Sequence, residues 1–107
     1  MTSSNKLWEI LVPRFSNEGL EYTLEHHKEW DNYVRQISNG ITILRTAKGQ
    51  WISPDGQLCA EEMIPVRIFC KDSDIEQIVD HTILYYDQEA VFSYEISSNV
   101  ILRYRLK

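Results

Sequence analysis

The sequence contains few of the residues that define specialised classes of protein. Among its 107 residues there are two cysteines, three prolines and four glycines, and no apolar run is long enough to cross a bilayer. A disulfide between Cys59 and Cys70 would need two thiols to meet that the predicted extended strand holds far apart, and isolated glycines do not form the loop that cradles a phosphate group. We therefore expect free thiols in a reducing compartment, no nucleotide or other cofactor, and no association with a membrane.

Positive charge is scarce as well. The sequence has 11 lysines and arginines against 16 aspartates and glutamates, which gives a formal net charge of −5. Proteins that bind nucleic acid without sequence preference do so mainly by neutralising phosphates, so we expect no nucleic-acid partner. The first residues carry neither the apolar core of a secretion signal nor the character of a transit peptide, which predicts a cytoplasmic protein.

What the sequence does contain is an average globular composition, with 43% apolar and 25% charged residues. A chain of this length has the usual size of a single folded unit and can bury an adequate core without disulfides or a metal. We expect residues 1–107 to form one domain.

Patterns typical of strands and helices alternate along the chain. Residues 7–15 form an apolar, β-branched and aromatic run that predicts a strand. Residues 23–38 place apolar side chains at helical spacing and are followed by Asn39 and Gly40, which favour the left-handed backbone that stops a helix. Two extended segments, 41–51 and 58–71, flank the turn sequence 53–56, which predicts a hairpin.

The second half of the chain repeats this order. Ser73 and Glu76 have the spacing of a capping box, in which two side chains bind the free amides at the start of a helix, and apolar residues continue at helical spacing to Tyr86. Residues 90–96 and 100–106 then alternate along extended runs, which predicts two strands. The predicted order is βαββαβ with an extra C-terminal strand.

This order predicts an α+β fold of the ferredoxin-like type. Two strand–helix–strand units with right-handed crossovers place two helices on one face of an antiparallel sheet, with the first strand between the third and the fourth. Alternation assigns Trp8, Ile10 and Val12, and the apolar positions within 64–70, to the face under the helices. We expect the core to lie there.

The opposite face of the predicted sheet is too apolar for open water. The residues assigned to it are Leu7, Glu9, Leu11, Met63, Pro65, Arg67, Phe69, Val91, Ser93 and Glu95. A broad apolar patch that holds a few charges usually marks an oligomer interface or a ligand cleft. We expect a second copy of the protein to cover this open face.

Three charged residues meet on the open face if the strand order holds. Glu9 is expected to have Arg67 on one side and Glu95 on the other. An arginine between two carboxylates can anchor a polar ligand, and a carboxylate with a raised pKa can act as a general base. The interpretation that we favour is a charge cluster that fixes the register of a dimer.

Histidine and cysteine offer the remaining chemistry. His26 and His27 open the first predicted helix, but adjacent histidines do not converge easily on one ion, so we expect no metal site. One histidine is expected to be exposed and the other to pack against Trp30. Cys70 falls on the core face, and Cys59 lacks the neighbouring base that a catalytic thiolate needs, so no catalytic residue is assigned.

Several motifs in the hairpin region give a family resemblance. They are Gly40-Ile41-Thr42, Gly49-Gln50-Trp51, Pro54-Asp55-Gly56 and Glu61-Glu62, followed by Val66 and Ile68. The chain resembles, over nearly its whole length, small uncharacterised bacterial proteins carried on mobile integron gene cassettes. Over residues 26–96 it more distantly resembles a bacterial domain family of unknown function. The resemblance implies a ferredoxin-like fold, self-association, and Trp51 and Glu61 as family features, but no activity.

These observations predict a binding or interaction module that forms a homodimer or larger homo-oligomer through the open face, with or without a small-molecule ligand. The residues proposed for the ligand or the interface are Glu9, Arg67, Glu95, His26, Trp51 and Glu61. The alternative is a dimeric α/β-barrel enzyme, in which Glu9, Arg67 or His26 transfers a proton within a cavity between sheets. A dry interface would favour the module, and a pocket with convergent polar groups would favour the enzyme.

Overall fold

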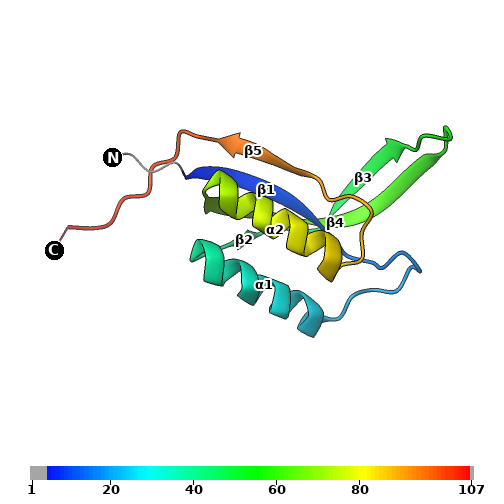
Figure 1. Ribbon diagram of the computed structural model, residues 1–107, viewed down its shortest axis with the longest axis horizontal. Helices are drawn as coiled ribbons and strands as arrows, with labels where there is room; N and C mark the ends of the chain where they lie inside the picture. Colours follow the sequence, from blue (N-terminus) through cyan, green and yellow to red (C-terminus); the bar gives the residue numbers. More distant parts are fainter. Residues whose placement is uncertain (1–4, 107) are drawn as a thin grey trace.

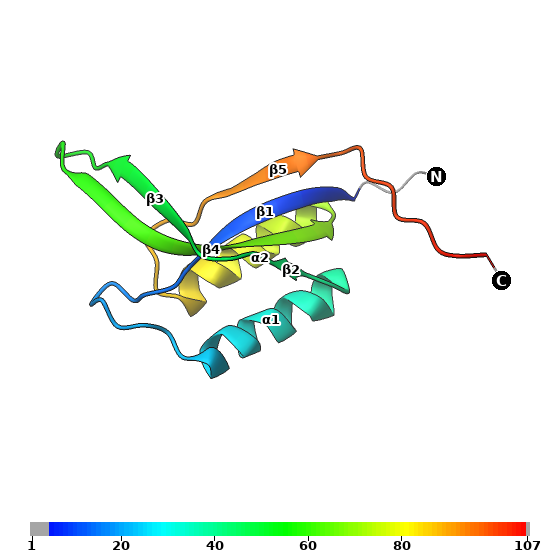
Figure 2. The same cartoon turned by 180° about the vertical axis from the view of Figure 1, so that it is seen from behind.

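The structure is a computed structural model of the chain, and it describes residues 5–106; residues 1–4 and 107 lie outside the described part. The elements follow in the order β1 (Lys6–Pro13), α1 (Leu24–Ser38), β2 (Thr42–Ile43), β3 (Ala47–Ile52), β4 (Leu58–Cys70), α2 (Asp72–Tyr85) and β5 (Ser93–Ser97). Within residues 5–106 they build two layers, in which α1 and α2 cover one face of a five-stranded sheet (Figures 1 and 2).

The strand order confirms the predicted fold class. The sheet runs β2-β4-β1-β5, with every neighbouring pair antiparallel, and β3 pairs with β4. Across β1 and β4, Trp8 is opposite Ile68 and Ile10 is opposite Val66. The first strand therefore lies between the third and fourth predicted strands, as a ferredoxin-like α+β fold requires.

The core lies between the sheet and the two helices. It consists of Ile10, Val12, Val66, Ile68 and Cys70 from the sheet and Trp30, Val34, Ile75, Ile78 and Tyr86 from the helices and the residue after α2, all at most 4% exposed. Burial of a large apolar side chain contributes about 1.5–3 kcal/mol relative to leaving it in water. This layer is therefore the main source of stability.

Both ends of α1 follow the predicted signals. Thr23 Oγ1 accepts a hydrogen bond from the backbone N–H of His26 at 3.1 Å, and Asn39 ends the helix in the left-handed conformation. The turn at 53–56 also forms as predicted, with Gly56 at a φ of 86°. Within the described residues no helix is long and apolar enough to cross a membrane.

The start of α2 differs from the predicted capping box. Lys71 is the residue that precedes the helix, and its backbone N–H donates to the Asp74 carboxylate at 3.3 Å. The box predicted at Ser73 and Glu76 is therefore wrong. The reason is that α2 begins almost directly after β4, which puts Asp74 rather than Glu76 in the first turn at the capping position.

The second predicted strand is split into β2 and β3. Ile43 is opposite Val66, whereas Ala47 is opposite Met63, so residues 44–46 face only two residues of β4. One of those two is Pro65, whose carbonyl accepts from the Leu44 N–H at 2.9 Å but which has no N–H to donate in return. The ladder breaks there, and the extra residue forms a bulge that turns the β3–β4 hairpin away from the helices (Figure 1).

The extra C-terminal strand that the sequence predicts does not form within the single chain. Residues 100–106 have no strand assignment, and the segment leaves β5 at the end of the molecule opposite the hairpin (Figure 2). The reason lies at Ser97, whose Oγ accepts from the Asn99 N–H at 2.9 Å. This local bend does not reverse the chain, so the segment cannot return along β5.

A buried hydrogen bond joins the two helices through the core. Trp30 Nε1 donates to Thr82 Oγ1 at 2.9 Å, and the Thr82 hydroxyl donates to the Ile78 carbonyl at 2.6 Å. Both side chains are almost fully buried, so water cannot replace either partner. The pair therefore fixes how α1 lies against α2.

Replacing Thr82 should reveal the value of this bond. We expect Thr82→Val to lower the free energy of unfolding by about 1–3 kcal/mol, because the indole N–H is left buried without an acceptor. Urea denaturation at fixed protein concentration measures the change. Thr46→Val, at an exposed position between β2 and β3, is the matched control and should change stability by less than about 0.5 kcal/mol. Equal stabilities of the two variants would contradict the role of the bond.

Candidate functional site

A polar network lies at the centre of the open face. Glu9 on β1 is opposite Arg67 on β4 and Tyr94 on β5. Arg67 Nε donates to Glu9 Oε1 at 3.0 Å, and the Tyr94 hydroxyl donates to Glu9 Oε2. Glu9 is only 7% exposed, so its charge is balanced by these two partners rather than by water.

The predicted neighbour Glu95 is not part of this network. It is opposite Trp8 on the helix-covered side, and its carboxylate lies 3.7 Å from Lys6 Nζ. The prediction was wrong by one residue: Tyr94 takes the place beside Glu9, and the pairing of β1 with β5 is irregular between Leu7 and Trp8. Such a shift moves every side chain of a strand to the opposite face.

The same shift corrects Ser93, another residue assigned to the open face. Ser93 is opposite Ile10 and so belongs to the helix-covered side, whereas Val91, which precedes β5, packs against the core and also lines a pocket on the open face. Phe92 and Tyr94 lie on the open face instead, with ring centroids 5.5 Å apart. The open face is therefore more aromatic than the sequence pattern indicated.

The network is built to hold strands together. The hydrogen bond to Glu9 raises the pKa of the Tyr94 phenol, which keeps its proton on the oxygen that donates. Each of the two carboxylate oxygens of Glu9 already accepts a hydrogen bond from a neighbouring strand. The arrangement ties β4, β1 and β5 in one register and leaves the Arg67 side chain, 43% exposed, as its solvent-facing member.

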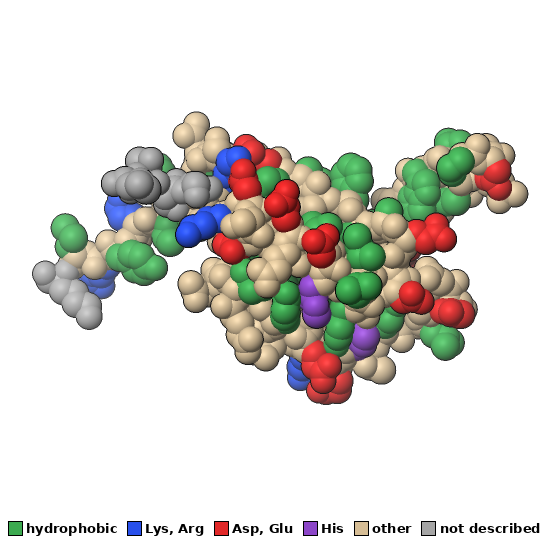
Figure 3. All heavy atoms as spheres, viewed as in Figure 1, with side chains coloured by type: hydrophobic (Ala, Val, Ile, Leu, Met, Phe, Trp, Pro, Cys, Tyr) green, Lys and Arg blue, Asp and Glu red, His purple; other side chains and the backbone are tan. Residues whose placement is uncertain are grey.

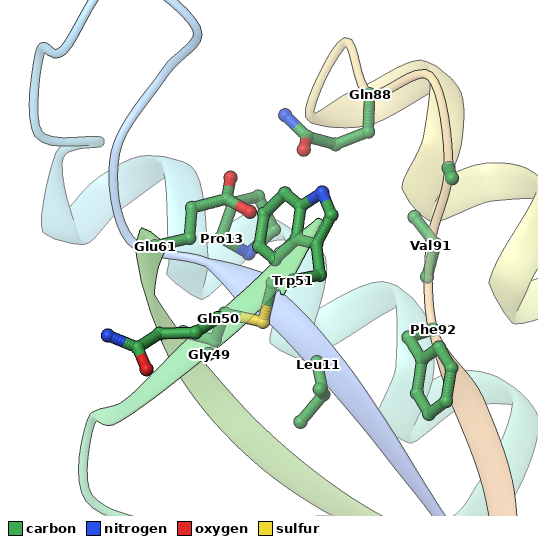
Figure 4. Close-up of a pocket in the computed structure, with 11 residues that line it drawn as sticks. Leu11, Pro13, Gly49, Gln50, Trp51, Glu61, Gln88, Val91 and Phe92 are labelled. Carbon is green, nitrogen blue, oxygen red and sulfur yellow. The ribbon is translucent and has the colours of Figure 1, made fainter. Parts of the chain in front are cut away.

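A pocket of about 410 Å³ lies farther along the open face, between the β3–β4 hairpin and the segment that precedes β5. We call it the hairpin pocket; its lining residues are Leu11, Pro13, Gly49, Gln50, Trp51, Glu61, Met63, Gln88, Ala90, Val91 and Phe92. Figure 4 shows the Trp51 indole at its centre, with Glu61 on one side and Val91 and Phe92 on the other. The structure thus brings two predicted residues, Trp51 and Glu61, into one site.

Local sequence explains why the pocket opens at this point. Gly49 is opposite Glu61 in the hairpin, and its backbone has no positive φ that would require glycine. The missing side chain therefore matters for space, because it leaves a gap on the strand beside Trp51. A Cβ at this position would have the Met63 sulfur as its nearest side-chain neighbour, at 3.6 Å. The sequence signal for this gap was an isolated glycine inside a predicted strand.

Glu61 is the polar residue of the hairpin pocket with the most distinctive chemistry. Burial raises the pKa of its carboxyl group above the usual value. Among the described residues that line the pocket, it is the only one with a charge. A carboxylate in an apolar setting gains more from a cationic partner than one in water.

The histidines lie elsewhere, in the helix layer. The His26 ring stacks between Tyr22 and Tyr85, with centroid distances of 4.7 and 4.2 Å, and its Nε2 is buried without a hydrogen-bond partner among residues 5–106. His27 Nδ1 lies 2.6 Å from the Tyr86 hydroxyl. The predicted packing against Trp30 is therefore wrong; the partners of the two histidines are Tyr22, which is close in sequence, and Tyr85 and Tyr86, which are distant in sequence.

Neither histidine meets Glu9 or Arg67, because the helices and the open face are on opposite sides of the sheet (Figure 3 shows the helix side). Burial lowers the pKa of His27, which keeps its ring neutral beside the Tyr86 hydroxyl. Within residues 5–106, no group of three or more histidine, cysteine, aspartate or glutamate side chains is placed to hold a metal ion.

The two cysteines are free and differ in environment. Cys59 is half-buried on the hairpin, opposite Trp51, whereas Cys70 is buried in the core. Burial raises the pKa of the Cys70 thiol to about 11, so very little thiolate forms there near neutral pH. Only Cys59 is accessible for reaction with a thiol reagent.

Thiol labelling should distinguish the two cysteines. With an aromatic disulfide reagent at pH 8, we expect the native chain to release one equivalent of chromophore, and the urea-unfolded chain to release two. Cys59→Ser should abolish the native reaction and leave one equivalent after unfolding. A native reaction that persists in this variant would show that the core around Cys70 opens freely.

Removal of the arginine should test the polar network. We expect Arg67→Ala to lower the free energy of unfolding by about 1–2 kcal/mol, because a buried carboxylate loses its cation while water replaces only part of the interaction. Urea denaturation at fixed protein concentration measures the loss. Arg45→Ala, at an exposed position, should change stability by less than about 0.5 kcal/mol. A loss no larger than that of the control would mean that Glu9 is solvated without Arg67.

Comparison with known proteins shows the fold. The chain matches no protein-family model and no curated protein. It is similar in structure to the periplasmic divalent cation tolerance protein CutA of Archaeoglobus fulgidus, with a TM-score of 0.67, 11% identity, and coverage of 92% of this chain and 88% of that one. CutA of Xylella fastidiosa is similar as well, with a TM-score of 0.68, 13% identity, and coverage of 94% of this chain and 88% of that one.

A phage SAM lyase in complex with S-methyl-5'-thioadenosine is similar as well, with a TM-score of 0.65, 15% identity, and coverage of 92% of this chain and 93% of that one. At these identities the likeness extends to the path of the chain and not to its side chains. The comparisons therefore show that this chain has the ferredoxin-like α+β fold of these proteins.

Proposed function

We propose that this protein is a small binding module that acts as a homo-oligomer, in which a second copy covers the open face. The observation that carries the proposal is the apolar character of that face: Leu11 and Phe69 stay partly exposed, and Phe92 is 66% exposed. Monomeric proteins seldom leave a broad apolar patch in water. A second copy is the simplest cover, because a two-fold contact brings the same patch onto itself.

The C-terminal segment supports self-association independently. Residues 100–106 alternate like a strand but have no strand partner among residues 5–106, and Leu106 is 93% exposed. The segment 100–107 holds three of the 11 basic residues and none of the 16 acidic ones, whereas acidic side chains are spread over the helix side of the molecule (Figure 3). A second copy offers this segment both a sheet edge and the opposite charge.

A small-molecule ligand fits the same proposal. The phage SAM lyase was solved with a small organic molecule bound, which supports such a ligand for this fold. The CutA proteins are named for divalent cation tolerance, but among residues 5–106 no side-chain group suited to a metal ion occurs. We therefore favour an organic ligand over a metal ion, and the hairpin pocket is the place for it.

Proton-transfer catalysis by the predicted residues has less support. Both carboxylate oxygens of Glu9 are hydrogen-bonded, and His26 lies on the side of the sheet away from Arg67. A general base needs a free basic atom within reach of the substrate. We retain the binding module as the proposed function; its place in the cytoplasm and its origin on an integron cassette remain predictions from the sequence.

Light scattering after size exclusion tests the assembly. At about 50 µM we expect a molar mass that is a multiple of the 12.6 kDa chain. Phe69→Lys should shift the population toward the monomer. The lysine would place a second cation beside Arg67 on the open face, where the proposed contact between copies is apolar. Truncation after Asn99 should also weaken the assembly.

The matched control is Leu84→Lys, which places the same cation at a position of α2 that is 82% exposed on the helix side. Its mass should equal that of the unaltered chain. An unaltered chain that stays monomeric at this concentration overturns the proposal. So does a Phe69→Lys variant that keeps the full mass while Leu84→Lys dissociates.

A further inference from the structure

We propose that the hairpin pocket binds a planar aromatic ligand that carries a positively charged amine. This inference rests on the proposed function, because it names the class of ligand that the open face would hold. The ring would stack on Trp51 and contact Phe92 and Val91, and the amine would pair with Glu61. Four observations of the pocket lead to this class of ligand.

The first observation is the size and surface of the hairpin pocket. Its volume of about 410 Å³ lies within the usual range of small-molecule sites, and most of its lining residues are apolar. Trp51, at its centre, has an exposed ring although an indole of this size usually becomes buried during folding. An exposed indole inside a hollow is a surface on which a second ring can stack.

The second observation is the charge of the lining. Among the described lining residues Glu61 alone is charged, and no lysine, arginine or histidine accompanies it. A phosphate or carboxylate ligand would therefore meet repulsion and no cation. A cationic ligand would meet a carboxylate and the face of an indole, both of which attract positive charge.

The third observation is that Glu61 has no partner for its charge in the described part of the chain. The neighbouring Glu62 forms an ion pair with Arg14, with 3.4 Å between Nη1 and Oε1, whereas no ion pair of Glu61 is present among residues 5–106. Glu61 is less exposed than Glu62. Burial raises the pKa of the Glu61 carboxyl, and a bound cation would return part of that cost.

The fourth observation is the absence of a side chain at Gly49, opposite Glu61. A methyl group at this position would contact the Met63 side chain at 3.6 Å, which is an ordinary contact, so neither packing nor backbone conformation requires glycine there. The effect of glycine at this position is to leave open space in the pocket beside Trp51. Gln88 completes the site from the other side of the pocket; its Nε2 donates to the Tyr86 carbonyl at 2.9 Å, which leaves its amide oxygen to accept from the polar edge of a ring (Figure 4).

Three probes with one ring system separate stacking from charge. Tryptamine is cationic at pH 7.5, indole is neutral and indole-3-acetate is anionic. In calorimetric titrations of the full chain we expect tryptamine to bind at least about tenfold more tightly than indole, and indole-3-acetate to bind most weakly. Equal affinities, a preference for the anion, or no binding of any probe at millimolar concentration would overturn the proposal.

Variants assign the two contributions to residues. Glu61→Gln should bring tryptamine to the affinity of indole, whereas Glu89→Gln should leave the preference intact, because Glu89 is an exposed carboxylate that does not line the pocket. Trp51→Ala should weaken tryptamine and indole alike, by about tenfold or more. These positions lie outside the core, and an unchanged melting temperature will confirm that each variant is folded. Loss of the preference in Glu89→Gln would assign the effect to general charge and overturn the site.

The pH dependence gives a second readout. Tryptamine keeps its charge below neutral pH, whereas Glu61 must be ionised to bind it. The preference for tryptamine over indole should therefore disappear as the pH falls through the pKa of Glu61, at a higher pH than for an ordinary glutamate. A preference that is constant down to pH 4 would contradict the role of Glu61.

Light scattering of the same samples distinguishes this inference from the proposed assembly. A monomeric chain that prefers tryptamine would overturn self-association and support the ligand class. An oligomer that binds the three probes equally would support self-association and overturn the ligand class.

Discussion

The pairing of β1 with β4 determines which side chains lie on each face at the centre of the sheet. On one side of this pair Ile10 and Val66 are buried under the helices, and on the other Arg67 donates to Glu9 at 3.0 Å. A slip of one residue would bring the two charges under the helices and expose the apolar residues. Burial and the ion pair therefore favour the same register from opposite sides of the sheet. This agreement lets the flanking strands be short or irregular without loss of the fold.

Pro65 shapes the part of the sheet that carries the pocket, through the hydrogen-bond donor that it lacks. Because the ladder between β4 and the preceding strand breaks at Pro65, β3 starts again one residue out of step and the hairpin leaves the helix layer. In the described part of the chain no helix covers either face of the hairpin (Figure 1), which explains why Trp51 and Ile52 are exposed although both are large apolar residues. The pocket is a consequence of this divergence, since its walls are the hairpin, β1 and the segment before β5.

The parts of the fold that follow from local patterns and from the strand order were predictable from the sequence, and those that depend on the exact register or on packing between helices were not. Helix α1, the turn at 53–56 and the contact of Glu9 with Arg67 follow from periodicity and strand order. The register of β5 does not, because Val91 and Phe92 are both apolar and alternation cannot choose between them. The stack around His26 depends on Tyr85, which is brought close only by packing of the helices. Residues 100–106 have the pattern of a strand, but a pattern cannot supply a partner.

The shape of the molecule limits how copies can meet. The hairpin projects at one end and the segment after β5 leaves at the other, in both views of a molecule that is 54 Å long (Figures 1 and 2). The C-terminal segment therefore cannot reach the hairpin of its own chain, and a contact between them must join two copies head to tail. A contact through the open face, by contrast, is symmetric when the same patch meets itself. The two contacts use different surfaces, so one does not exclude the other. In the proposed assembly, a head-to-tail contact would form a closed ring only if successive copies return to the first one, and the basic residues of the segment would face acidic surfaces of the next copy.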